Sequence, residues 1–216
     1  MYTEYQPSHL LVPYIDSYWE FKGNPDYGMR IHILPDGCTD FIFTLGEVAN
    51  AVEEGSLIMQ PYRSYFVGPM TKYSELVTYT ESIHMFGVRF LPCGLSCFTN
   101  LPLHEFVNSR VSTNEMKAVF DDTFIEKLGE QKHVTDRIRV VEEYLLAYLA
   151  RHYQPADSHV AMAVNMINHS KGKRSVPSLM DDVCFSVILR ESSSIIPDLL
   201  LKNTAVLLNL RMLWNC

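Results

Sequence analysis

The stretch Arg30-Ile-His-Ile-Leu-Pro-Asp-Gly-Cys-Thr-Asp-Phe-Ile-Phe-Thr-Leu45 decides the fold of the first hundred residues. Its first five residues alternate between polar and apolar side chains, and Pro35-Asp-Gly37 is a typical turn sequence. The following residues, 39–45, are rich in aromatic and β-branched side chains and end at Gly46. We therefore predict two β-strands, over residues 30–34 and 39–45, with a turn between them.

Three further short runs have the same character and are separated by Gly, Pro and polar residues. They cover residues 64–67, 75–80 and 83–90. Ahead of them, residues 9–19 are expected to form a short helix that runs into a first strand. Short strands at this spacing are typical of a small antiparallel barrel or sandwich.

The hydrophobic period becomes helical after residue 94, with helices expected over residues 114–120, 122–128, 136–150 and 157–168. The helix over 136–150 is the clearest, because one stripe holds its apolar residues Ile138, Val141, Leu145, Tyr148 and Leu149. The predicted fold class is α+β: an N-terminal antiparallel β-barrel or sandwich followed by an α-helical C-terminal region. We divide the chain into a β-rich domain (1–105), a helical connector or dimerisation region (106–155) and a C-terminal helical region (156–216).

Charge is distributed unevenly along the chain. The net charge is −7, which does not suit a protein whose whole surface binds nucleic acid. Residues 170–216 hold six Lys and Arg against four Asp and Glu, so this end carries +2 and the remainder −9. An acidic body with a mildly basic end permits DNA binding at that end.

The cysteines and the start of the chain indicate a cytoplasmic protein. The five cysteines are odd in number and irregularly spaced, which favours reduced thiols. The first residues are polar and lack a secretory apolar segment, and no apolar run approaches the ~20 residues of a membrane-spanning helix.

Catalytic and metal motifs are weak in this sequence. His32, His84, Cys38 and the pair Cys93/Cys97 suit zinc by residue type, but a C-x3-C spacing alone is weak, and buried apolar cysteines are the preferred interpretation. A G-x-S-x-G nucleophile motif and a glycine-rich phosphate loop are both absent. We therefore predict no enzyme activity, no metal and no cofactor.

Aromatic residues crowd the first ninety positions, where they can fill a core or line a binding pocket. Both interpretations stay open from the pattern alone. From these aromatics and the block over residues 34–43 we take as candidate ligand-binding residues Trp19, Asp36, Cys38, Asp40 and Arg89.

The C-terminal region contains a candidate helix-turn-helix over residues 175–186. A first helix would bury Val176, Leu179, Met180 and Val183, and Ser186 could cap a second helix. An ordinary pair of helices in a bundle explains the pattern equally well.

Several sequence blocks resemble the AraC family of bacterial transcription regulators. The opening Tyr-x-Pro-x-x-x-Leu…Tyr-x-x-x-Tyr-Trp falls within residues 5–19, Leu-Pro-Asp-Gly at 34–37, and two later blocks at 67–69 and 87–94. The resemblance covers about residues 5 to 186. It implies a cupin-like β sensor for a small-molecule effector, connecting or dimerising helices and a DNA-binding end, with a homodimer as a further expectation. On this basis the candidate DNA-binding residues are Lys171, Lys173, Arg174, Ser186 and Arg190.

The resemblance ends after Ser186. The family's recognition helix of the Leu-x-Arg-x-Phe type and its Gly-x-Ser-Pro segment do not follow, and a second helix-turn-helix has no room. A changed reading frame and genuine divergence both explain this tail, whose apolar residues 199–213 are expected to pack against the chain's own helices or a second subunit. We expect an AraC-like regulator with an incomplete DNA-binding end; the alternative is a ligand-binding or dimerising protein that has lost DNA binding.

Overall fold

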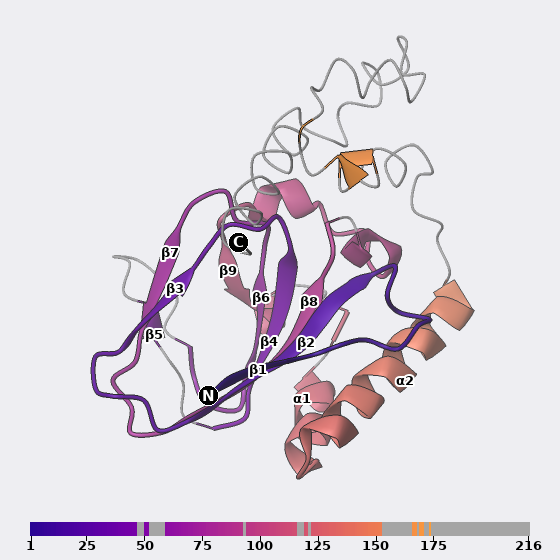
Figure 1. Cartoon of the computed structure of the whole chain (residues 1–216). Coiled ribbons are helices and arrows are strands. Elements are labelled where there is room, and N and C mark those ends of the chain that lie inside the picture. Colours follow the sequence, from indigo (N-terminus) through magenta and orange to yellow (C-terminus); the bar gives the residue numbers. More distant parts are fainter. Residues whose placement is uncertain are drawn as a thin grey trace.

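The computed structural model describes residues 1–46, 50–51, 59–92, 94–115, 119–120, 122–152, 166–167, 169–170 and 173 (Figure 1). A large antiparallel sheet has the strand order β1 (Tyr2–Tyr5), β2 (Ile15–Gly23), β8 (Ile83–Phe90), β4 (Thr39–Thr44), β6 (Ser64–Val67) and β9 (Arg110–Ser112). A small antiparallel sheet has the order β3 (Arg30–Ile33), β7 (Ser74–Val77) and β5 (Asn50–Ala51). Short 3-10 helices η1 (Gly94–Cys97), η2 (Leu103–Phe106) and η3 (Thr113–Glu115) precede helices α1 (Asp122–Glu130) and α2 (Val134–His152).

The two strands predicted from residues 30–45 are confirmed, but they belong to different sheets. β3 pairs with β7 in the small sheet, and β4 lies between β8 and β6 in the large one. The turn between them therefore carries the chain across from one sheet to the other. Its backbone requires glycine at Gly37, where φ is +73°, and the Cys38 amide donates to the Asp36 carboxylate at 2.9 Å.

The described residues form three layers: the small sheet, the large sheet and the helices. Figure 1 shows β3, β7 and β5 on one side of the large sheet and α1 and α2 on the other. Successive side chains of β4 point to opposite faces of the large sheet, so this strand packs against both the helices and the small sheet. Phe41 and Phe43 are fully buried in the cluster that includes the helices, whereas Ile42 belongs to the cluster facing the small sheet. The predicted α+β class is confirmed, and of the two architectures considered the structure is a sandwich.

Helix α2 packs along the apolar stripe that the sequence predicts. Val141 and Leu145 are completely buried, and Ile138, Tyr148 and Leu149 lie partly buried against the same core. Within the described part of the chain, no helix combines the length and apolarity needed to cross a membrane.

Some elements of the structure differ from those that the sequence predicts. Residues 9–14 form a succession of turns where a short helix was predicted, because Pro13 interrupts the helical hydrogen bonds before β2 begins. The sequence pattern did not predict β1 or β9, which are short edge strands that pair with β2 and β6. The helix predicted over 114–120 is wrong where the structure describes it: residues 114–115 belong to the 3-10 helix η3, and residues 119–120 form a bend. Most of the helix predicted over 157–168 lies outside the described residues; Ile167, within them, is buried. The division at residues 105 and 155 stays a prediction.

Candidate functional site

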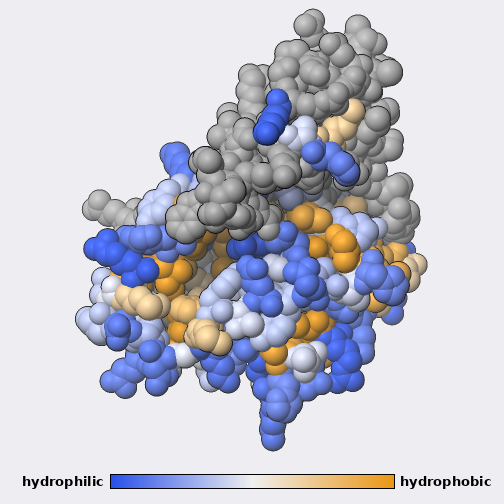
Figure 2. Space-filling model, viewed as in Figure 1, coloured by the Kyte–Doolittle hydropathy of each residue, from blue (hydrophilic) through white to orange (hydrophobic). Residues whose placement is uncertain are grey.

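A cavity of about 780 Å³ lies between the two sheets. This volume is in the range of small-molecule binding sites. On the face seen in Figure 2, apolar surface is exposed on the side where the small sheet lies and in further patches over the rest of the described part, with hydrophilic residues between them. The cavity is apolar along most of its wall, through Phe21, Ile31, Ile33, Ile42, Val67, Met70, Leu76 and Met85.

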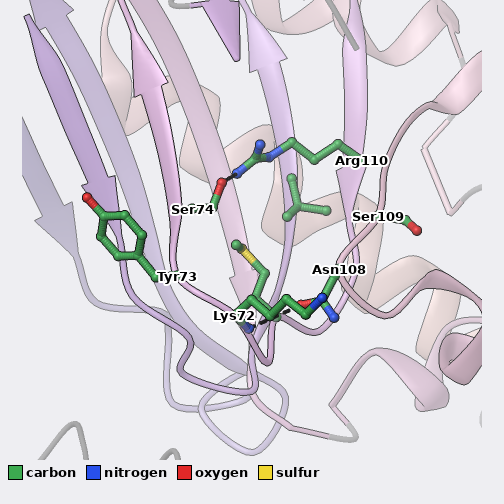
Figure 3. A pocket seen from close by; sticks show the side chains of 8 residues that line it. Lys72, Tyr73, Ser74, Asn108, Ser109 and Arg110 are labelled. Atoms are coloured by element: carbon green, nitrogen blue, oxygen red, sulfur yellow. Dashed lines mark hydrogen bonds between the residues drawn. The ribbon is translucent and has the colours of Figure 1, made fainter. Parts of the chain in front are cut away.

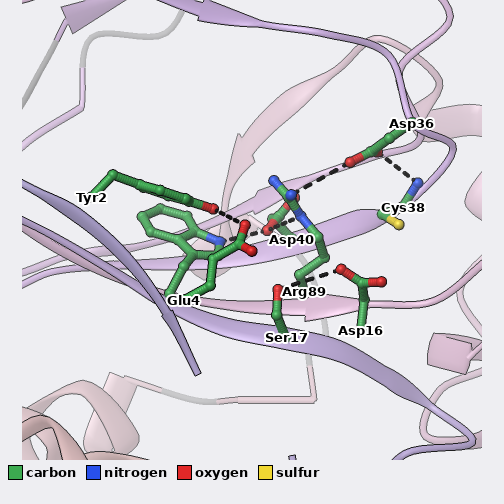
Figure 4. Close-up of polar contacts among 9 residues, drawn as sticks. Tyr2, Glu4, Asp16, Ser17, Asp36, Cys38, Asp40 and Arg89 are labelled. Atoms are coloured by element: carbon green, nitrogen blue, oxygen red, sulfur yellow. Dashed lines mark hydrogen bonds and ion pairs between the residues drawn. The ribbon is translucent and has the colours of Figure 1, made fainter. Parts of the chain in front are cut away.

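One end of the cavity is polar and is built on neighbouring strands of the large sheet. Arg89 on β8 stands directly opposite Asp40 on β4. The Arg89 Nε donates to both Asp40 carboxylate oxygens, at 3.2 and 3.3 Å, and its Nη1 lies 3.5 Å from Asp36 Oδ2 (Figure 4). Two carboxylates therefore share one guanidinium. We call Glu4, Asp36, Asp40 and Arg89 the polar end.

Trp19 crosses β8 to reach this cluster. Its indole Nε1 donates to Asp40 Oδ1 at 2.8 Å, although β8 lies between β2 and β4. Gly87 makes the crossing possible, because a Cβ atom at that position would lie 1.9 Å from Trp19 Cε2. The glycine thus provides the space in which the indole lies flat across the strand.

Two residues of β1 complete the wall around the polar end. The Tyr2 hydroxyl donates to Glu4 Oε1 at 2.7 Å, and the Tyr2 ring centre is 6.0 Å from that of Trp19. Both residues line the cavity (Figure 4). Neither was among the candidates from sequence, because a four-residue edge strand carries too short a pattern.

At the polar end, burial and the Arg89 charge shift the pKa of Asp40 in opposite directions. Burial raises the pKa of Asp40, and the Arg89 guanidinium works against that rise. The paired Asp40 carboxylate in turn raises the pKa of Arg89, which stays charged. Burial, followed by the nearby Asp36 charge, raises the pKa of the Cys38 thiol well above its ordinary value, so Cys38 is a neutral thiol and a poor nucleophile.

A second pocket of about 210 Å³ adjoins the cavity and shares Val67, Met70 and Arg110 with it (Figure 3). Arg110 Nη2 donates to Ser74 Oγ at 2.7 Å, and the Asn108 side chain is bonded to Thr71. These polar side chains of the second pocket are therefore already bonded within the protein, and the bond from Arg110 to Ser74 joins the large sheet to the small sheet. The larger cavity is the stronger candidate for a ligand.

The opposite face of β2 contacts α2. Glu20 Oε1 lies 2.9 Å from Arg137 Nη1 and 3.0 Å from His84 Nε2. Arg137 also donates to the backbone oxygens of Leu128 and Gln131 at the end of α1, which ties the two helices together.

A second contact joins the same two elements. The Tyr18 hydroxyl donates to Glu142 Oε1 at 3.4 Å, and the Ser8 amide donates to the same oxygen at 2.7 Å. The polar links between β2 and α2 therefore begin at Tyr18 and Glu20, the residues on either side of Trp19.

The structure brings together all five candidate ligand residues, Trp19, Asp36, Cys38, Asp40 and Arg89, at one end of the cavity. Their binding role stays a prediction. Among the candidate DNA-binding residues, Lys173 is exposed, whereas Lys171, Arg174, Ser186 and Arg190 and the helix-turn-helix over 175–186 lie outside the described residues.

The residues considered for a metal site are dispersed. His32 pairs with Glu75 at 3.2 Å, His84 contacts Glu20, Cys38 lines the cavity and Cys97 is buried in the helix-facing core. Among the residues that the structure describes, no three His, Cys, Asp or Glu side chains are grouped to hold a metal ion. Cys93 lies outside the described residues.

Comparison with known proteins places the β-rich part of the chain in a family. The family model described as a domain of unknown function, DUF6597, matches residues 3–112, which is more than half of the chain. No curated protein and no solved structure matches. The match spans both sheets and every residue of the polar end.

Proposed function

We propose that this chain, which belongs to the DUF6597 family, is an AraC-like bacterial transcription regulator that senses a small molecule between its two sheets. In this proposal the protein is cytoplasmic and not an enzyme, and its cupin-like β domain controls transcription through the C-terminal helix-turn-helix. Its partners are the effector, DNA and a second copy of the chain. The observation that carries the sensing role is the position of β2, which contacts the cavity and α2 on alternate residues.

The alternation gives a direct physical link. Successive side chains of a strand point to opposite faces of a sheet. Trp19 lies on the cavity wall, and its neighbours Tyr18 and Glu20 contact α2 through Glu142 and Arg137. A ligand that displaces Trp19 together with its backbone would therefore displace both helix contacts.

The polar groups of the cavity favour binding over catalysis. Arg89 and Asp40 are held in a buried ion pair, and the Cys38 thiol is kept neutral. Such groups orient a ligand, but a covalent reaction needs a nucleophile with an activating base. These features support a sensor.

DNA binding by this chain is proposed to be weak. Affinity for DNA comes mainly from phosphate contacts and specificity from base contacts. The sequence after Ser186 offers Arg190, Lys202 and Arg211, which are too scattered to replace a recognition helix. This departure also favours a second candidate function, a ligand-binding or dimerising protein that no longer binds DNA.

A ligand screen tests the sensing role. The unfolding temperature of the full chain is measured across a library of small molecules, with the cavity variant Gly87→Ala as the matched comparison. A ligand at 100 times its Kd should raise Tm of the native protein by about 5–10 °C. The effect should be lost in the variant. Ligands that stabilise both proteins equally would place binding outside the cavity.

DNA binding is tested separately, by fluorescence anisotropy at low salt with DNA from upstream of the chain's own gene. Weak binding that changes with a cavity ligand supports the regulator, and sub-micromolar, sequence-dependent binding would contradict the proposed loss of affinity. Complete absence of binding at low salt would favour the second candidate function.

A further inference from the structure

The charges at the polar end select the kind of ligand that the cavity can hold. Glu4, Asp36 and Asp40 contribute three carboxylates, whereas Arg89 contributes one guanidinium. Arg89 already contacts both aspartates. The polar end therefore carries an excess of negative charge that a positively charged ligand group would neutralise.

The aromatic rings beside these carboxylates suit the same kind of group. Tyr2 and Trp19 line the cavity with their ring centres 6.0 Å apart, and Tyr2 is half exposed. The Tyr2 hydroxyl is bonded to Glu4, and the Trp19 indole N–H to Asp40, so each ring is held next to a carboxylate. Organic cations bind favourably to the faces of such rings.

The rest of the wall suits a hydrocarbon. Met70, Met85, Val67 and Leu76 line the cavity, and all four are buried. Methionine side chains adapt to ligands of different shape. A ligand with its charged group at the polar end would therefore lay an apolar body along this wall.

We propose that the cavity binds an organic cation, an amine or quaternary ammonium with an apolar body. The inference rests on the sensing function proposed above. The alternative ligand for this cavity is an anion, attracted by Arg110, which lies on β9 beside its strand partner Val67 and also lines the cavity. Arg110 is bonded to Ser74, and the carboxylates of the polar end would repel an anion that enters the same cavity.

The test compares three probes of equal chain length: octylamine, 1-octanol and octanoate. Trp19 fluorescence is followed at pH 7 in the full chain carrying Trp214→Phe, which leaves Trp19 as the single tryptophan. Octylamine is expected to bind at least about tenfold more tightly than 1-octanol, as a charge-assisted contact predicts, and octanoate should bind weakest. Octanoate binding as tightly as octylamine, or saturable binding by none of the probes, would overturn the inference.

The variant Glu4→Gln separates charge from shape. Because Glu4 is exposed, the variant protein should keep the native fold, which circular dichroism checks. Octylamine affinity should fall about 1.5- to fivefold while 1-octanol affinity is unchanged. An equal loss for both probes would refute a role for charge. Failure of the sensing function has a different signature: octylamine would bind as expected but leave amide hydrogen exchange in α2 unaltered.

Discussion

Replacing Gly87 with alanine tests the arrangement on which the cavity depends. The new methyl group would lie 1.9 Å from Trp19 Cε2 and 2.3 Å from Nε1, so the indole has to leave its place across β8. Trp19 would then lose its hydrogen bond to Asp40. The backbone at Gly87 does not need glycine for its conformation, since its φ lies outside the left-handed region, and the expected effect is steric.

The magnitude follows from three contributions. Losing a hydrogen bond to a charged, buried acceptor costs about 1.5–3 kcal/mol. Overpacking a tightly filled site costs about 1–3 kcal/mol. Replacing glycine within a strand returns about 0.5–1 kcal/mol by restricting the unfolded chain. The free energy of unfolding should therefore fall by about 1.5–5.5 kcal/mol.

Urea denaturation followed by Trp19 fluorescence, with Trp214→Phe in both proteins, measures this change. The control is Gly129→Ala in α1, where a Cβ atom meets nothing within 4 Å, so stability should rise by about 0.5 kcal/mol. In the absence of urea, the folded Gly87→Ala variant should also show a Trp19 fluorescence emission spectrum that differs from the parent's. If the free energy of unfolding of Gly87→Ala lies within about 0.5 kcal/mol of the parent's and the emission is unchanged, Trp19 does not lie over Gly87.

Three other predictions concern buried polar groups. Burial lowers the pKa of His84, so the neutral imidazole stabilises the fold above pH ~6.5, and this stabilisation is lost as pH falls through the folded-state pKa. The variant His84→Gln should therefore lose less stability between pH 7 and 5 than the parent. An unchanged pH profile of the free energy of unfolding would contradict this. Arg137→Met should cost about 3 kcal/mol in urea denaturation, because Glu20 loses its buried partner, whereas Arg139→Met at an exposed pair should cost under about 0.5 kcal/mol; equal costs would argue against the Glu20 contact. Cys38 should react with iodoacetamide much more slowly in the native chain than in urea, as measured by peptide mass spectrometry, and rapid native labelling would show that the thiol is neither buried nor neutral.

The sequence predicted those parts of the fold whose pattern is long enough to be read locally. β6 and β8 have the predicted bounds, and β3 and β4 differ from them by one residue at the end. Which sheet each strand joins depends on pairing between distant residues, so the crossing between β3 and β4 was not predictable. β1 and β9, with four and three residues, exist because a neighbouring strand supplies their hydrogen bonds.

The candidate site was predictable where the sequence concentrates unusual residues. The block over residues 34–43 and the aromatics led to Trp19, Asp36 and Asp40. Arg137 was missed because a charged helical residue is ordinarily exposed. Its position four residues before Val141, on the buried stripe of α2, was the available signal.

The proposed sensing role requires the cavity and α2 to be coupled through β2. The indole N–H resonance of Trp19 reports on the cavity side of this link, and the Trp214→Phe background leaves it as the single indole signal in a ¹H–¹⁵N spectrum. Glu142→Gln alters the contact with Tyr18 on the opposite face, and Arg139→Gln on the exposed side of α2 is the control. We expect the Trp19 resonance to shift in Glu142→Gln and to stay in place in Arg139→Gln. A resonance at the parent's position in both variants would show that the cavity and α2 are not coupled through β2.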